Sequence, residues 1–176
     1  MTMTSDLFTT AQMFGYAVLI VGLVTFSRKR DTHFKGWLIG QNLLYAIHFF
    51  LMGNLAAMVG SMLSSTRTLL SLYTRSMVVV VLLLTANVLL GFWVVKAAWN
   101  VIPLTATAIA TVAMFRLQGL RLRYVMLLCT ALSLTNNILT GSVGGTAMEI
   151  MIAVMSCITI FRLRREKNYE RQQTKT

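Results

Sequence analysis

The sequence predicts an all-α, polytopic membrane protein with seven transmembrane helices. Of its 176 residues, 56% are hydrophobic and only 12% are charged, whereas a soluble domain is about a quarter charged. The hydrophobic residues form long runs, and the basic residues stand in short clusters between those runs. This pattern argues against a soluble enzyme. It also assigns the net charge of +11 to the ends of membrane spans rather than to a face that binds nucleic acid.

Each span needs about 20 apolar residues to cross the hydrocarbon core. The expected spans, in chain order, are Phe8–Phe26, Gly36–Met52, Leu55–Tyr73, Met77–Val95, Trp99–Phe115, Arg123–Thr140 and Gly144–Phe161. The second and third are separated only by Gly53 and Asn54, a pair typical of a tight turn. The first is expected to be retained, because a cleaved signal peptide has basic residues before its apolar run and this chain has Asp6 there.

Basic residues mark every second connection between the expected spans. They cluster at 28–35, at 75, at 116–123 and at 162–175, whereas the opposite side holds only Lys96. Cytoplasmic loops retain lysine and arginine. We therefore expect the N-terminus outside and the C-terminus in the cytoplasm, which requires an odd number of spans.

A shift of 88 residues (141 − 53) places the last three spans on the first three without a gap. The shift places Gly53 on Gly141, Lys35 on Arg123 and the intramembrane His48 on Asn136. Two parallel three-helix repeats joined by a linker helix, a 3+1+3 arrangement, would explain this agreement. The expected parts are a first repeat at 1–76, a linker helix at 77–98, a second repeat at 99–165 and a polar cytoplasmic tail at 166–176.

Several short motifs carry a resemblance to a known family. They are Ile47-His48-Phe49-Phe50-Leu51 with Gly53, Arg67-Thr68-Leu69 with Thr74-Arg75-Ser76, Asn137, and Gly141-Ser142-Val143-Gly144-Gly145-Thr146 with Glu149. From about Phe14 to Arg165, the chain resembles the YgjV family of bacterial inner-membrane proteins. The resemblance implies the bacterial inner membrane as the location and a 3+1+3 fold grouped with the SWEET, PQ-loop and PnuC-type carriers. It implies no particular substrate.

Two departures limit what the resemblance implies. The proline–glutamine pair of the PQ-loop carriers is absent, since Pro103 is the only proline and is followed by Leu104. The family is also expected to have histidine where this chain has Asn136. A mechanism that needs two titratable imidazoles is therefore weakened.

Two charged residues lie inside expected spans. Glu149 is the only carboxylate there, and it should be protonated, paired or facing water because a buried carboxylate is costly. It is either an acid that couples protons or contacts a ligand in a central cavity, or a structural acid paired, for example, with Lys96. Arg67 either extends toward the inner headgroups or faces the cavity, where it would favour an anionic substrate.

Uncharged polar residues provide further candidates. His48 and Asn136 occupy equivalent places, with Asn137 beside the second. They are candidates for ligand contact or an outer gate, and the alternative is hydrogen bonding between packed helices. Ser61 and Ser65 share one face of the third span. They give weak support for a face that contacts water, because serine hydroxyls can also donate to carbonyls of their own helix.

The sequence gives little support for covalent chemistry. Cys129 and Cys157 are interpreted as buried thiols without a disulfide, and no motif for a metal, a cofactor or a catalytic nucleophile is present. We therefore expect no enzymatic activity, no cofactor and no metal.

The preferred function is an inner-membrane carrier or facilitator for a small polar metabolite, and the alternative is a non-transporting receptor or scaffold. Expected partners are membrane lipids and a small polar ligand, without nucleic acid, and a homo-oligomer stays open. The two functions differ in whether His48, Asn136 and Glu149 face one cavity.

Overall fold

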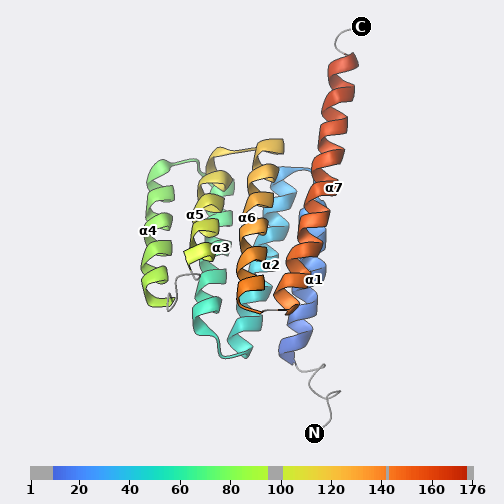
Figure 1. Ribbon diagram of the computed structural model, residues 1–176. Coiled ribbons are helices and arrows are strands. Elements are labelled where there is room, and N and C mark those ends of the chain that lie inside the picture. Colours follow the sequence, from blue (N-terminus) through green and yellow to red (C-terminus); the bar gives the residue numbers. More distant parts are fainter. Residues whose placement is uncertain (1–9, 95–100, 142, 174–176) are drawn as a thin grey trace.

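The computed structural model describes residues 10–94, 101–141 and 143–173. These residues form seven α-helices and no strand (Figure 1). The helices are α1 (Thr10–Ser27), α2 (Asp31–Leu51), α3 (Leu55–Tyr73), α4 (Met77–Val94), α5 (Val101–Arg116), α6 (Gly119–Leu139) and α7 (Val143–Gln173). The predicted all-helical class is thereby confirmed.

Six of these helices pack in a closed ring, in the order α1, α2, α3, α5, α6, α7 and back to α1. In Figure 1, α5, α6 and α7 lie in front of the layer formed by α1, α2 and α3. Helix α4 lies at the edge of the bundle, against α3 and α5. The buried apolar cluster, with Phe34, Met114 and Leu122 at its centre, therefore lies inside the ring.

The outside of the bundle is apolar. On α4, Val78 and Leu82 are exposed, and Phe92 is exposed over 83% of its surface. Within the described ranges, two helical stretches, Gly119–Leu139 and Gly145–Tyr169, are long and apolar enough to cross a membrane by themselves. Shorter apolar helices cover Gln12–Ser27, Met77–Phe92 and Val101–Arg116.

Helix α2 is long enough to span a membrane, at 21 residues, but it is less apolar than α6 or α7. Its polar side chains include Lys35 and Gln41, and both are buried within the bundle. The low apolarity of α2 therefore comes partly from its inward face and partly from its first turn, where Thr32 and His33 are exposed. Seven membrane crossings remain a prediction.

Glycine closes the two tight connections at one end of the bundle. Gly53 follows α2 with φ +73°, and Gly141 follows α6 with φ +69°. The N–H of each bonds to a carbonyl three residues earlier, Phe50 O and Ile138 O respectively. Asn54 then caps α3 by accepting the Ala57 N–H, so the predicted Gly-Asn turn is present.

Helix α7 is longer than expected. We predicted a span ending at Phe161 and a separate polar tail at 166–176, but α7 continues to Gln173 and extends beyond the other helices (Figure 1). No glycine or proline follows Gly145 to end the helix. An ion pair between Glu166 and Lys29, next to α1, also holds this segment against the bundle.

We expect Gly53→Ala to destabilise the protein, because a Cβ at φ +73° strains the backbone by about 1–2 kcal/mol. Gly60→Ala is the matched control. A Cβ there meets only Leu90 Cδ2 at 3.9 Å, and alanine favours a helix interior. Thermal unfolding in detergent should show a lower Tm for Gly53→Ala alone, and equal Tm values would contradict the left-handed turn.

Candidate functional site

Charged residues join the helices at the end of the bundle that holds the α1–α2, α3–α4 and α5–α6 connections, here called the basic end. Asp31 of α2 contacts Arg123 of α6 at 3.3 Å and accepts the Gly119 N–H at 2.6 Å. Its carboxylate thus lies at the N-terminus of α6, where the helix dipole favours negative charge. Arg123 is only 4% exposed and its guanidinium stacks on Phe34, 3.9 Å from the ring centroid. These contacts connect α2 to α6.

Lys35 connects two further helices at the basic end. It is 7% exposed, and its Nζ donates to Ser71 O of α3 at 3.1 Å and to Met114 O of α5 at 2.7 Å. Both carbonyls lie in the last turn of their helices, where a cation is favoured. Lys35 therefore closes the contact between α3 and α5.

A direct hydrogen bond takes the equivalent place between α7 and α1. Thr159 Oγ1 donates to Phe26 O at 2.8 Å. Adding 88 to Ser71 gives Thr159, and adding 88 to Phe26 gives Met114. The α3–α5 and α7–α1 contacts thus use positions that are 88 residues apart, and a lysine is inserted only between α3 and α5.

A polar pocket of about 250 Å³ opens beside Lys35 at the basic end. Its lining includes Ser71, Arg75, Arg116 and Gln118, so three basic side chains face it together with Asp31. Since Asp31 already contacts Arg123, the pocket favours an anion.

Arg67 lies deeper in the bundle, on α3. It is 7% exposed, and its Nη1 donates to Thr107 O of α5 at 3.1 Å and to Thr111 Oγ1 at 3.4 Å. Its Nε is buried, and no residue in the described part of the chain accepts a hydrogen bond from it. Arg67 therefore points into the ring rather than toward headgroups, and its partners are on α5 rather than at Glu149.

Two glycines of α1 make room for polar side chains of α2. A Cβ at Gly15 would lie 3.3 Å from His48 Cε1, and one at Gly22 would lie 2.8 Å from Gln41 Nε2. The two glycines are seven residues apart, as are Gln41 and His48, so both pairs follow one seam. His48 thus packs against α1, with its ring centroid 5.4 Å from that of Phe49.

Glu149 is half-buried near the start of α7. Within the described residues, no hydrogen bond or ion pair reaches its carboxylate, although Tyr45 of α2 lies nearby. Tyr45 itself donates to Met148 Sδ at 2.9 Å. The expected alternative partner, Lys96, lies outside the described residues.

The other expected site residues lie on α6 and α3. Asn136 and Asn137 are half-buried, and Asn136 Oδ1 is buried without a hydrogen-bond donor from the residues that the structure describes. Ser61 donates to Ala57 O of its own helix, and Ser65 is buried. His48, Asn136 and Glu149 do not line the pocket beside Lys35, so the sharing of one cavity stays a prediction.

Sequence reasoning missed the roles of Asp31, Lys35 and Arg123, which it treated as charges at span ends. Two signals were present in the sequence. Asp31 and Lys35 are four residues apart at the start of a helix, and the 88-residue shift places Lys35 on Arg123. A basic residue at both of two positions that the shift aligns indicates a structural position rather than a loop charge.

The two cysteines have different surroundings. Both are free thiols, as predicted, but only Cys129 is buried, with Sγ 3.4 Å from Ala106 O. The prediction that Cys157 is also buried is wrong, because it lies on an outward face of α7. In the described part of the chain, no three histidine, cysteine or acidic residues are grouped to hold a metal ion.

A model of the family Imp-YgjV, described as "Bacterial inner membrane protein", matches residues 9–167. The chain belongs to this family. Inner membrane protein YgjV of Escherichia coli (strain K12) is 30% identical over 152 residues, which cover 86% of this chain and 83% of that protein. No solved structure matches. The family description gives a location in the inner membrane, which fits the apolar exterior of this member.

We expect the Asp31–Arg123 pair to be strongly coupled, because removing one partner leaves a buried charge alone. Asp31→Asn or Arg123→Gln should each lower the free energy of unfolding by about 3 kcal/mol, and the double variant should lose clearly less than their sum. Reversible unfolding in mixed micelles measures this cycle.

The exposed pair Lys29–Glu166 is the matched control for that cycle. Replacing either partner by glutamine should change the free energy of unfolding by about 1 kcal/mol or less. Equal coupling in the two pairs would show that Asp31 and Arg123 do not hold α2 to α6.

Proposed function

We propose that the protein is an inner-membrane carrier or facilitator that moves a small polar metabolite between two three-helix halves. Helices α1–α3 form one half, α5–α7 form the other, and α4 is the linker. The fold would then be the 3+1+3 arrangement of SWEET- and PnuC-like carriers, in which the halves rock about a site between them.

The geometry of the helices supports two equivalent halves. Shifting α2 (31–51) by 88 residues gives 119–139, which are the bounds of α6. The contacts between helices also recur in the same order. The α1–α2 contact corresponds to α5–α6, and the α2–α3 contact corresponds to α6–α7. The α1–α7 contact corresponds to α5–α3.

The observation that carries the proposal is the buried guanidinium of Arg67. A charge inside an apolar bundle costs several kcal/mol unless it is fully partnered, and the two oxygens of Thr107 and Thr111 leave its Nε without an acceptor. A carboxylate or phosphate of a solute would supply that acceptor in the geometry that arginine favours. The preferred metabolite is therefore anionic.

Other residues have roles that follow from their positions in this proposal. The pocket beside Lys35 would admit the solute from the basic end. At the opposite end, His48, Asn136 and Asn137 would contact the ligand or gate the path, and Glu149 would set charge or couple a proton. Ser61 and Ser65 lie on α3, the helix that carries Arg67.

A receptor or scaffold is the second candidate, and the length of α7 favours it. Arg162, Arg164 and Arg165 are on the part of α7 near the basic end, and all three are exposed there. That segment presents positive charge to an acidic partner without any path through the bundle.

Thermal unfolding of the purified protein with a panel of metabolites tests the proposed site. The panel pairs anionic and neutral members of the sugars, nucleosides, vitamin precursors and amino acids. A ligand at about 100 times its Kd adds about 2.7 kcal/mol, which raises Tm by several degrees. We expect an anionic member to raise Tm, and Arg67→Gln to abolish that rise.

Arg121→Gln is the matched control, because it removes one exposed arginine near the basic end that lines neither the pocket beside Lys35 nor the interior at Arg67. Flux of the same compound into proteoliposomes then separates a carrier from a receptor. Binding without flux would favour the receptor, and no Tm response from any anionic compound would contradict the site at Arg67.

A further inference from the structure

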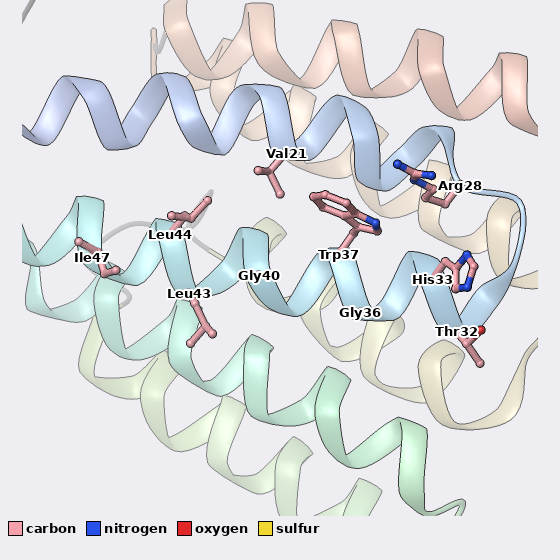
Figure 2. A pocket seen from close by; sticks show the side chains of 10 residues that line it. All are labelled: Val21, Arg28, Thr32, His33, Gly36, Trp37, Gly40, Leu43, Leu44 and Ile47. Carbon is pink, nitrogen blue, oxygen red and sulfur yellow. The ribbon is translucent and has the colours of Figure 1, made fainter.

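We propose that a groove between α1 and α2 is a binding site for one anionic phospholipid of the leaflet at the basic end. This α1–α2 groove has a volume of about 750 Å³ and opens on the outside of the bundle (Figure 2). Arg28, Thr32 and His33 form one end, and Ile47 lies toward the other (Figure 2). It is separate from the polar interior used in the proposed function.

The floor of the groove is made by glycines. Gly36 and Gly40 are one turn apart on α2, and a Cβ at either would meet no atom within 4 Å. Glycine inside a helix costs about 0.5–1 kcal/mol relative to alanine, so two at this spacing open a surface that side chains would otherwise fill. Val21 of α1 and Leu44 of α2 line the walls, and the channel is apolar.

The dimensions of the groove fit an acyl chain. From Gly36 to Ile47 is 11 residues, or about 16 Å along the helix. Half of the hydrocarbon core of a bilayer is about 15 Å thick. Because the groove begins at the basic end and runs along the helix axis, one acyl chain fills it from the headgroup level to the midplane.

The charge at the basic end fits a phosphate. The Arg28 guanidinium lies 5.3 Å from the centroid of the Trp37 ring, which is 41% exposed. Arg28 Nε is buried and has no acceptor in the described part of the protein, and no carboxylate lines the groove. The neighbouring Lys29 is paired with Glu166, whereas Arg30 is exposed.

These features select both the lipid class and the leaflet. Arginine binds phosphate in a bidentate geometry, and the excess positive charge favours a headgroup that is anionic overall over a zwitterionic one. By the positive-inside rule, the basic end faces the cytoplasm, where anionic lipids are accessible. The acyl chain would lie on Gly36 and Gly40, with the phosphate at Arg28 and the Trp37 ring between them.

Quenching of Trp37 by brominated lipids tests this site. Trp93→Phe and Trp99→Phe leave Trp37 as the sole tryptophan of the full chain in vesicles. Brominated phosphatidylglycerol and brominated phosphatidylcholine with the same acyl chains are compared at equal mole fraction. We expect phosphatidylglycerol to bind about fivefold more tightly, the factor given by about 1 kcal/mol per basic residue near the bilayer surface.

Variants separate the headgroup contact from the acyl channel. Arg28→Gln should bring the ratio of the affinities for the two lipids close to one. Arg28→Lys should keep most of the preference for phosphatidylglycerol, and Arg75→Gln should leave that preference unchanged. Gly40→Leu should weaken quenching by both lipids, while an unchanged Tm shows that the fold persists.

Three results would overturn the proposal. The first is equal quenching by both lipids in the unsubstituted groove, and the second is a preference that survives Arg28→Gln. The third is loss of the preference on adding inorganic phosphate, which would make the site one for a free anion. None of these readouts depends on transport, so failure here leaves the proposed carrier function unaffected.

Discussion

A charge inside this bundle must find its partner in the protein or in a bound solute, because the hydrocarbon around the bundle offers none. That constraint explains the basic end, where Asp31 neutralises Arg123 and caps α6. It also explains Lys35, which binds the last carbonyls of α3 and α5. Together these contacts fix how the two layers of the bundle face each other.

The same constraint makes buried polar groups with incomplete hydrogen bonding candidates for ligand contact. Arg67 Nε and Asn136 Oδ1 are both buried and lack partners among the described residues, one on each side of the proposed interface between halves. Structural polar residues, such as Lys35 and Thr159, have close partners instead. Arg123, Gln41 and Ser156 also have buried polar atoms without partners among the described residues, so the proposed solute site depends on the position of Arg67 inside the ring as well as on its free Nε.

The helices could be predicted because long apolar runs and glycine turns are local signals. The turns at Gly53 and Gly141 needed no tertiary information, since each connection is only a few residues long. The length of α7 could not be predicted, because its last turns have a polar sequence. The contact that holds them joins Lys29 and Glu166, which are 137 residues apart in the chain.

The candidate site was predictable only in part. Arg67 could be placed in a span, but either orientation satisfied the sequence until its contacts with Thr107 and Thr111 became visible. Lys35 was assigned to a connection because hydropathy alone does not distinguish a charge that caps two helices from one in water. The 88-residue shift was the better guide, since it places Lys35 on Arg123, and both side chains are buried where helices meet.

Accessibility of the interior to water-soluble reagents tests the central claim most directly. In a chain without its native cysteines, Asn136→Cys and Ser61→Cys would sample the interior, and Leu89→Cys on the exposed face of α4 would be the lipid-facing control. The measurement is labelling in intact cells by anionic and cationic methanethiosulfonates. A polar interior near Arg67 predicts labelling of both interior cysteines, at least as fast with the anionic reagent, and none at Leu89. Interior cysteines as unreactive as the one on α4 would contradict it.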